Sequence, residues 1–490
     1  MPRSRAAWED CTGGSQIALP GTPNHVDQIR SFLGEARHDV MKLLAFLMQT
    51  GGHIAGWRHA RAADNALCDA DYFQALGRTA EKGLFDGVFL ADYVGYHPVK
   101  GEAVFAGLES PKLDPLVVLA TIAAATRNIG LIGTASTTYS HPYDVARRFA
   151  SLDHVSGGRA GWNIVTSTME NEAHNYGFEA HLAHADRYAR ADEFVAVARK
   201  LWDSWQDGAV VADKMSGAYT DPARISAVDH QGEHFRVAGP LTVPRTPQGH
   251  PVLVQAGASA TGQQFAAANA EVIFTSHPTI FTAQAFRADM HAQLAQFSRS
   301  PESLKIMPAV TPVIGRTRAE AEDLKRELDD LIPARIAISK LEGLLGNVDL
   351  SGADPDGPLL ELPAEALAGQ NSTRDRVLEL SEREMLSIAE LARRVAAGRT
   401  GHTIVGTAED IADTLIEWEN GGAADGFVIS APFLPGGLED FVDMVVPILQ
   451  ERGHFRREYE GTTLRENLGL AVPPNGFDAD PASRRRPEIW

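Results

Sequence analysis

Short apolar segments alternate along most of this chain with longer segments in which apolar residues recur every three or four positions. The short segments predict strands at residues 41–48, 86–91, 129–135, 159–165, 252–255, 272–275, 304–314 and 426–430. The longer segments predict helices at residues 71–82, 115–126, 142–155, 187–205, 262–270, 281–297, 319–331, 373–397, 408–419 and 438–452. A strand followed by a helix, repeated in this way, is typical of a parallel sheet covered by helices. Eight strands in this pattern predict an α/β protein whose sheet closes into a (β/α)8 TIM barrel with insertions.

Helix-end signals support several of these boundaries. Asp114 is a suitable N-cap, and Pro115 is suitable for the first position of the helix that follows. Proline has no N–H group, and an N–H at that position would have no acceptor within the helix. Gly83 and Gly157 follow predicted helices, where glycine readily takes the backbone conformation that ends a helix. Apolar side chains in 187–205 share one face, so this segment predicts a long amphipathic helix packed on the sheet.

Two long interruptions and two ends complete the predicted layout. Residues 41–455 are expected to form the barrel. Two insertions interrupt it: 207–250, which is rich in Gly, Pro and Asp, and 332–400, which breaks the alternation of strands and helices. An insertion near the C-terminal face of a barrel commonly acts as a lid or a substrate loop. Residues 1–40 are expected to be a loosely ordered N-terminal extension, and 456–490 a C-terminal tail.

Charge and cysteine content narrow the function classes. The chain has 45 Lys and Arg against 64 Asp and Glu, a formal charge of −19, which disfavours nucleic-acid binding because phosphate contacts need clustered cations. Two distant cysteines, Cys11 and Cys68, form neither a disulfide framework nor a metal site, so a reducing cytoplasm is the expected compartment. No apolar run approaches the roughly 18 residues that a membrane span needs.

Several cofactor and metal motifs are missing from the sequence. It contains no GxGxxG, no GxxxxGK[ST], no HExxH and no paired CxxC. These motifs carry dinucleotide, nucleoside-triphosphate and zinc sites. The sequence therefore predicts neither an NAD(P)H site within this chain nor a bound metal.

Two segments are candidate phosphate sites. Residues 255–265, QAGASATGQQF, join a predicted strand to a helix, and their small side chains would let backbone N–H groups and the Ser259 hydroxyl approach an anion. His184 and Tyr188 begin the long amphipathic helix four positions apart, on one face. The alternatives are an ordinary N-cap role for Ser259, and Asp186 as a cap with Tyr188 in the core.

Polar residues also end consecutive predicted strands. Asp92, Thr134 and Asn163 lie at or near the C-terminal ends of the second, third and fourth strands, where a barrel has its active site. His53 follows the first strand and is a candidate catalytic acid or base, because histidine titrates near neutral pH. Each of these residues is also compatible with an ordinary loop position.

A resemblance adds to these observations. Residues 134–167, TASTTYSHPYDVARRFASLDHVSGGRAGWNIVTS, are similar to the nitrilotriacetate monooxygenase component A family, a branch of the bacterial luciferase-like flavin monooxygenases. Further similar blocks are MKLLAFLMQTGGHIAGWRH (41–59), FDGVFLADY (85–93), DRYARADEFVAVARKLWDSW (186–205), HFRVAGPL (234–241) and QAGASATGQQFAA (255–267). The family also includes enzymes acting on EDTA and dibenzothiophene sulfone.

The resemblance implies a (β/α)8 barrel that binds FMN at its C-terminal mouth. It implies a two-component monooxygenase: a separate NAD(P)H:flavin reductase supplies reduced FMN through a transient encounter, and O2 oxygenates a small organic substrate. By motif position, the implied FMN ligands are Asp92, Thr134, His184, Tyr188 and Ser259, with Asn163 a weaker candidate. A homodimer or homotetramer is usual in such a family.

Other functions stay open at this point. The same barrel could carry a deazaflavin-dependent hydride-transfer oxidoreductase or a non-enzymatic flavin-binding protein. A hydrolase with paired carboxylates has only Asp92 and Glu102 to offer. The sequence does not define the substrate, although an aminopolycarboxylate would need pocket cations such as Arg58, Arg61 or Arg159.

Overall fold

The computed structural model describes residues 40–48, 51–64, 66–96, 112–257, 259–346, 348–359, 372–397 and 402–479. All of these residues belong to one compact unit that begins at Val40. The extension expected at 1–40 lies, except for Val40, outside the described residues.

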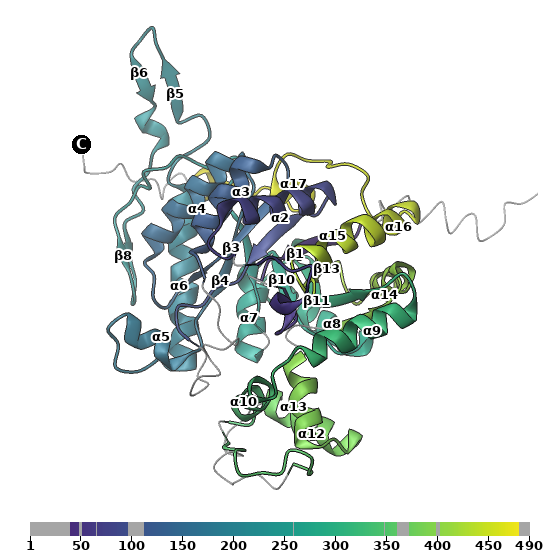
Figure 1. Cartoon of the computed structure of the whole chain (residues 1–490). Helices are drawn as coiled ribbons and strands as arrows, with labels where there is room; N and C mark the ends of the chain where they lie inside the picture. Colours follow the sequence, from purple (N-terminus) through teal and green to yellow (C-terminus); the bar gives the residue numbers. More distant parts are fainter. Residues whose placement is uncertain are drawn as a thin grey trace, which may run out of the picture. The chain divides into compact units, whose positions relative to one another are not determined.

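Eight parallel strands form a closed ring (Figure 1). They are β1 (Lys42–Phe46), β2 (Gly87–Leu90), β3 (Gly130–Ser136), β4 (Ala160–Val165), β9 (Val252–Gln255), β10 (Val272–Thr275), β11 (Lys305–Ile314) and β13 (Gly426–Ile429). The ring follows chain order and closes where β13 pairs with β1, with Lys42 opposite Gly426. The predicted strands are these eight, and the predicted TIM barrel is confirmed.

Alternation along the strands separates the barrel interior from the helix-facing layer. In β1, Leu44 and Phe46 belong to the inner cluster with Phe89, Ile132 and other strand residues. Leu43 and Ala45 instead pack in the cluster that the outer helices cover. Both faces of the strands are buried, which explains why the sequence shows continuous apolar runs.

A ninth strand, β12 (His402–Gly406), was not predicted as a strand. It pairs with β11 from Val310↔His402 to Ile314↔Gly406, and Val310 also pairs with Ile429 of β13. β11 is ten residues long, whereas most strands of the ring have four to six. The C-terminal half of β11 extends beyond its pairing with β13, and β12 forms hydrogen bonds with that half.

Helices surround the ring at positions close to the predicted ones. They are α2 (Ala70–Lys82), α3 (Pro115–Ala125), α4 (Pro142–Ser156), α6 (His184–Asp203), α7 (Ala260–Asn269), α8 (Ile280–Gln296), α9 (Arg318–Asp330) and α14 (Ala408–Asn420). Asp114 caps α3 by accepting from the N–H groups of Leu116 and Val117, as predicted. Gly157 ends α4 at φ +74°.

The last helix is not continuous. The prediction gave one helix at 438–452, whereas the structure has α15 (Gly436–Asp440), a π-helical turn (Phe441–Val445) and α16 (Val446–Glu451). Pro447 lies just after the turn and cannot donate a backbone hydrogen bond, and its ring would clash with the preceding helical turn. The wider π turn relieves that clash.

The first insertion contains short strands that the sequence did not indicate. β5 (Val210–Asp213) and β6 (Ala218–Thr220) form a hairpin that points away from the barrel (Figure 1), and β7 (His230–Gln231) pairs with β8 (Arg236–Val237). Strands of two to four residues are too short to show an alternating pattern.

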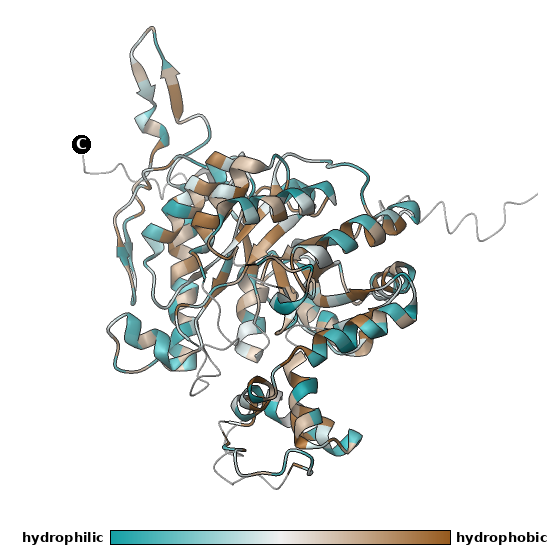
Figure 2. Ribbon diagram, viewed as in Figure 1, coloured by the Kyte–Doolittle hydropathy of each residue, from teal (hydrophilic) through white to brown (hydrophobic). Residues whose placement is uncertain are grey.

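The second insertion is helical and has its own apolar cluster. α10 (Ala334–Leu344), α12 (Ser372–Glu384) and α13 (Ile388–Ala397) turn apolar faces inward and hydrophilic faces outward (Figure 2). Ile54 and Ala55, from the loop after β1, belong to the same cluster. The insertion is therefore packed onto the end of the barrel where the strands finish.

The C-terminal segment is part of the barrel rather than a separate tail up to residue 479. The prediction ended the barrel at 455, but Leu464 in α17 (Leu464–Asn467) and Leu468 and Leu470 after it join the inner barrel cluster. A short final helix, α18 (Gly476–Ala479), follows. Three leucines in short turns give no helical or strand period, so the sequence offered no sign of this packing. Within the described part of the chain, no helix is long and apolar enough to span a membrane.

Candidate functional site

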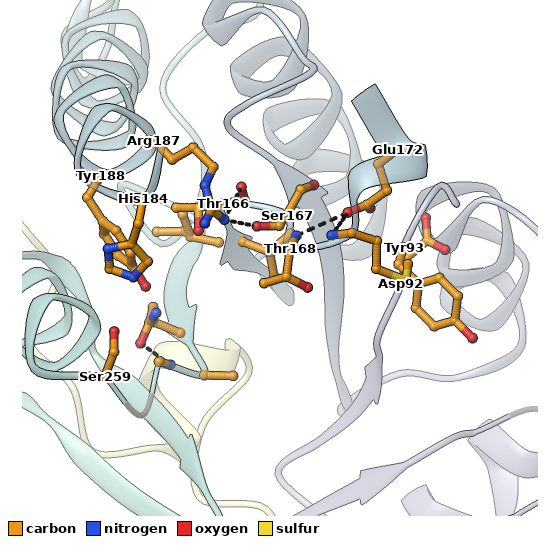
Figure 3. Close-up of a pocket in the computed structure, with 16 residues that line it drawn as sticks. Asp92, Tyr93, Thr166, Ser167, Thr168, Glu172, His184, Arg187, Tyr188 and Ser259 are labelled. Atoms are coloured by element: carbon orange, nitrogen blue, oxygen red, sulfur yellow. Dashed lines mark hydrogen bonds between the residues drawn. The ribbon is translucent and has the colours of Figure 1, made fainter. Parts of the chain in front are cut away.

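A cavity of about 670 Å³ lies where β2, β4 and β9 end (Figure 3). It is lined by Asp92, Tyr93, Ile164, Val165, Thr166, Ser167, Thr168, Met169, Glu172, His184, Arg187, Tyr188, Gln255, Ala256, Gly257 and Ser259. Its volume is in the range of small-molecule and cofactor pockets. The carboxyl ends of the strands are also the functional end of characterised TIM-barrel enzymes.

One end of the cavity is formed by the start of α6. His184 and Tyr188 lie side by side with ring centroids 4.9 Å apart, so the expectation that they share a helix face is confirmed. The residue before the helix is Ala183, and no side chain caps the helix start. The first N–H groups of α6 therefore keep their affinity for an anion.

The start of α7 approaches the same end of the cavity. Ser259 accepts a hydrogen bond from the Gly262 N–H at 3.1 Å, so it is an N-cap, and it also lines the cavity. A Cβ atom on Gly262 would lie 2.9 Å from Tyr188 Oη, and one on Gly257 would lie 2.9 Å from Gly262 Cα. The glycines thus allow two helix starts and the Tyr188 hydroxyl to converge.

Arg187 places a positive charge in this wall, and the sequence reasoning did not single it out. Its side chain is buried, and Nη1 donates to the carbonyl oxygens of Ser167 and Thr166. Among the described residues its Nε has no hydrogen-bond partner. A cation in the first turn of α6 that also lines the cavity favours an anion at this end of it. The signal in the sequence was its place between His184 and Tyr188 in the first turn of α6.

Asp92 lines the other end of the cavity, with Tyr93 and Glu172 (Figure 3). Burial, helped by the charges of Asp114 and Glu172, raises the pKa of Asp92 to about 6, although the Tyr93 backbone N–H and Lys112 act to lower it. The Lys112 ammonium lies 3.5 Å from the centroid of the Tyr93 ring. This end therefore combines an aromatic ring with a carboxyl group that changes charge near pH 6.

The raised pKa of Asp92 predicts a pH-dependent stability effect. The neutral carboxyl is the favoured form in the fold, so its contribution is complete below the unfolded pKa and is lost as pH rises through about 6. Asp92→Asn should therefore increase the free energy of unfolding at pH 8 by about 1.5 kcal/mol, because the amide carries no charge. This is about half of the value of a two-unit pKa shift, since Asp92 is partly exposed and solvent screens its charge. At pH 4 the gain should vanish. Urea unfolding at both pH values measures it, with exposed Asp64→Asn as the control; an equal gain at both pH values would contradict the assignment.

Thr134 and Asn163 do not line the cavity but lie in the strands beneath it. The Thr134 hydroxyl donates to the Leu90 carbonyl at 2.8 Å and accepts from Asn163 Nδ2 at 2.8 Å. Asn163 Oδ1 is buried without a protein partner. The pair links β2, β3 and β4 below the cavity floor, and any direct contact with a cofactor remains a prediction.

His53 also lies outside the cavity lining. It is 3% exposed, its Nδ1 accepts from the Ala55 N–H at 3.2 Å, and its Nε2 lies 3.2 Å from Asp329 Oδ1. Both ring nitrogens are thus engaged inside the protein. These contacts tie the loop after β1 to the end of α9.

The three arginines considered for an anionic substrate have other partners. Arg58 donates to the Leu331 carbonyl, and Arg61 pairs with Asp440 at 2.7 Å. Arg159 is fully buried and donates to carbonyl oxygens at the C-terminal end of α3, including that of Ala123 at 3.0 Å. None of the three lines the cavity, so this expectation is wrong for the site described. Glu102 lies outside the described residues.

Other cavity residues were not singled out individually from the sequence. Tyr93 lies three residues after β2, Gln255 ends β9 at the start of the candidate phosphate segment 255–265, and residues 166–169 form a loop that lines the wall. Glu172 lies in the short helix α5 (Glu170–Asn175), which was not predicted. A six-residue helix is too short to give a detectable period.

Comparisons of sequence place this chain among known enzymes. The luciferase-like monooxygenase family matches residues 44–425. The chain is 47% identical to N-acetyl-S-(2-succino)cysteine monooxygenase of Bacillus subtilis (strain 168) over 89% of this chain and 98% of that protein. It is 46% identical to nitrilotriacetate monooxygenase component A of Aminobacter aminovorans over 88% of this chain and 97% of that protein.

Solved structures agree with the sequence comparison. DmoA from Hyphomicrobium sulfonivorans is 32% identical and superposes with a TM-score of 0.81 over 91% of this chain and 96% of that chain. Riboflavin lyase, solved with modified FMN and its substrate riboflavin, is 34% identical with a TM-score of 0.78 over 89% of this chain and 97% of that chain.

Proposed function

We propose, from the premise that this chain belongs to the luciferase-like monooxygenase family, that it is the oxygenating component of a two-component FMN-dependent enzyme. Its substrate would be a small organic molecule such as an aminopolycarboxylate, a sulfone or a related compound. The observation that carries the proposal is the anion site at one end of the cavity. Two helix starts and the Tyr188 hydroxyl converge there, and the Arg187 cation lines the same cavity.

The cavity supports FMN in its length as well as in its charge. His184, Tyr188 and Ser259 at one end suit the phosphate, and Asp92 and Tyr93 lie at the opposite end (Figure 3). An elongated molecule with an anionic tail and a ring system would occupy both ends. The modified FMN in the riboflavin lyase structure adds a related precedent for a flavin in this fold.

Reduced FMN, when bound, supplies the electrons with which O2 is activated. The residues of this chain bind and orient the molecule: helix N-termini and Arg187 hold an anion, while Tyr188 and Ser259 donate hydrogen bonds. The apolar side chains of Ile164, Val165 and Met169 in the cavity wall offer water no hydrogen-bonding partner. The His53–Asp329 contact supports a positioning role for His53, which holds the loop after β1 in place.

A separate protein would deliver the reduced flavin. The nitrilotriacetate relative is named as component A of its enzyme, which implies a second component. We infer that an NAD(P)H:flavin reductase meets this chain transiently, because the sequence carries no dinucleotide motif of its own. We also infer a homodimer or homotetramer.

Binding of FMN is the first test. Tyr188→Phe and His184→Ala are each expected to raise the Kd of FMN about tenfold, because each removes a hydrogen bond to a charged group. Fluorescence titration measures the affinity, with Tyr219→Phe in the exposed β6 strand as a matched control. Unchanged affinity in both variants would show that the phosphate lies elsewhere.

Turnover is the second test. With a flavin reductase, NADH and FMN, the protein should consume O2 and form an oxygenated product from a panel of sulfones, sulfides and aminopolycarboxylates. A deazaflavin-dependent oxidoreductase would instead bind and turn over the deazaflavin, and a storage protein would bind FMN without forming product. Running this assay once with FMN and once with the deazaflavin therefore separates the three functions.

A further inference from the structure

The loop after β2 forms one wall of the cavity without belonging to a helix or strand. Its residues Asp92 and Tyr93 line the cavity, and Figure 3 shows them opposite His184, Tyr188 and Ser259. A loop at such a position needs support if its side chains are to keep a fixed place. That support comes from the short helix α5.

Three side chains of α5 hold the loop. Glu172 Oε1 accepts from the Val94 N–H at 3.1 Å, Asn175 Nδ2 donates to the Val94 carbonyl at 2.7 Å, and Asn171 Nδ2 donates to the Tyr96 carbonyl at 2.5 Å. The N–H and carbonyl groups of Val94 and the carbonyl group of Tyr96 are thus all bonded to side chains of this one helix.

Glu172 joins this loop to a second one. Its Oε2 accepts from the N–H groups of Thr168 at 3.1 Å and Met169 at 3.0 Å, in the loop after β4. The residue is 2% exposed, so its charge is stabilised by these three backbone donors. Both loops that Glu172 connects line the cavity.

Gly95 shows how closely the loop and the helix approach each other. A Cβ atom at this position would lie 2.3 Å from Asn171 Oδ1 and 2.9 Å from Glu172 Cγ. A larger residue would force the Asn171 and Glu172 side chains, or the loop itself, to move. The close approach therefore depends on a glycine in the loop and on Asn171 and Glu172 in the helix.

We propose that α5 is a clamp that fixes Asp92 and Tyr93 against the end of the bound flavin remote from its phosphate. Asn171, Glu172 and Asn175 are positioning residues, because they act on the flavin through the loop that they hold. This inference rests on the proposed function. It adds three site residues that neither helical periodicity nor a motif indicated in the sequence. A helix of six residues is not stable by itself, so its contacts with the two loops also maintain α5.

The clamp predicts a distinctive pattern of flavin affinities in the full-length protein. The double variant Asn171→Ala/Asn175→Ala and the single variant Glu172→Gln should weaken FMN and riboflavin by the same factor, about tenfold, because both ligands share the ring system. Tyr188→Phe should weaken FMN alone, because riboflavin has no phosphate. Glu466→Gln is the matched control: Glu466 Oε2 accepts from the N–H groups of Thr462 and Thr463 at 2.8 and 3.0 Å, far along the chain in α17.

Fluorescence titration with the two flavins separates the outcomes. If the wild-type protein binds FMN but the clamp variants match Glu466→Gln for both flavins, the clamp is overturned while the proposed function stands. If the clamp variants lose only FMN, α5 acts on the phosphate and the clamp is again overturned. If the wild-type protein binds neither flavin, the proposed function fails and the flavin role of α5 with it. The double asparagine variant keeps the test valid if Glu172→Gln does not fold.

Discussion

Replacing Arg465 with methionine is expected to lower the free energy of unfolding by about 3 kcal/mol. Arg465 is fully buried and pairs with both oxygens of Glu271, at 2.5 and 3.0 Å, while its guanidinium also donates to three backbone carbonyl groups. Removing the cation leaves the Glu271 carboxylate and those carbonyl oxygens without their partner. The estimate is at the low end for a broken buried pair because the Glu271 side chain keeps 20% exposure.

The pH dependence gives this prediction a second measurement. Burial alone would raise the pKa of Glu271, but the Arg465 charge and hydrogen bonds lower it below its usual value. The pair therefore stabilises the fold above the unfolded carboxyl pKa, and this stabilisation is lost as pH falls through the lower folded value. In Arg465→Met, urea unfolding should show little of that acid-linked loss.

Two controls make the result specific. Arg457→Met removes an exposed arginine from the same segment and should change stability by less than about 0.5 kcal/mol. The double variant Arg465→Met/Glu271→Met should recover part of the loss, because no unpaired carboxylate remains, while the Leu253 N–H loses its acceptor. A loss below about 1 kcal/mol in Arg465→Met would mean that the C-terminal segment contributes little to the barrel.

The second large effect concerns His53 and Asp329. His53→Ala and Asp329→Ala are each expected to lower kcat for substrate oxygenation about tenfold and to increase O2 consumed without product. The reason is that each change removes one contact between the loop after β1 and α9, next to Ile54 and Ala55, which pack against the helical insertion. We expect the loosened loop and insertion to let more water reach the cavity.

Positioning and proton transfer by His53 give opposite patterns. For positioning, the double variant should lose no more than either single variant, and His53→Gln should retain most of the activity because its amide can still donate to Asp329. For general acid or base catalysis, His53→Gln should lose a hundredfold or more while Asp329→Ala loses less. Asp330→Ala, at the exposed neighbouring position, is the control, and product formed per O2 is the readout.

The regular part of the fold was predictable because its signals are local and repeated. Continuous apolar runs marked eight strands buried on both faces, and caps such as Asp114 and Gly157 marked helix ends. β12 was missed because its strand character depends on the extra length of its neighbour β11. The packing of Leu464, Leu468 and Leu470 depends on the shape of the barrel interior rather than on a period in the sequence.

The candidate site was predictable only in part, for a related reason. His184, Tyr188 and Ser259 were found because a helix start has a sequence signature and an affinity for anions. Arg187 and Glu172 matter through the Ser167 carbonyl and the Val94 N–H, which lie near them only in the folded chain. Conversely, strand-end position placed Thr134 near the site without revealing that its hydroxyl faces the Leu90 carbonyl.

Closure of the ring has a consequence for how the protein is made. β1 finds its second neighbour only in β13, and the leucines that fill the opposite end of the barrel come still later, at 464–470. During synthesis the early strands therefore keep one edge unpaired and their interior faces uncovered until residues 426–470 have left the ribosome. Slow or interrupted translation before residues 426–470 would leave a chain with an open sheet edge and uncovered apolar faces, which is prone to aggregation.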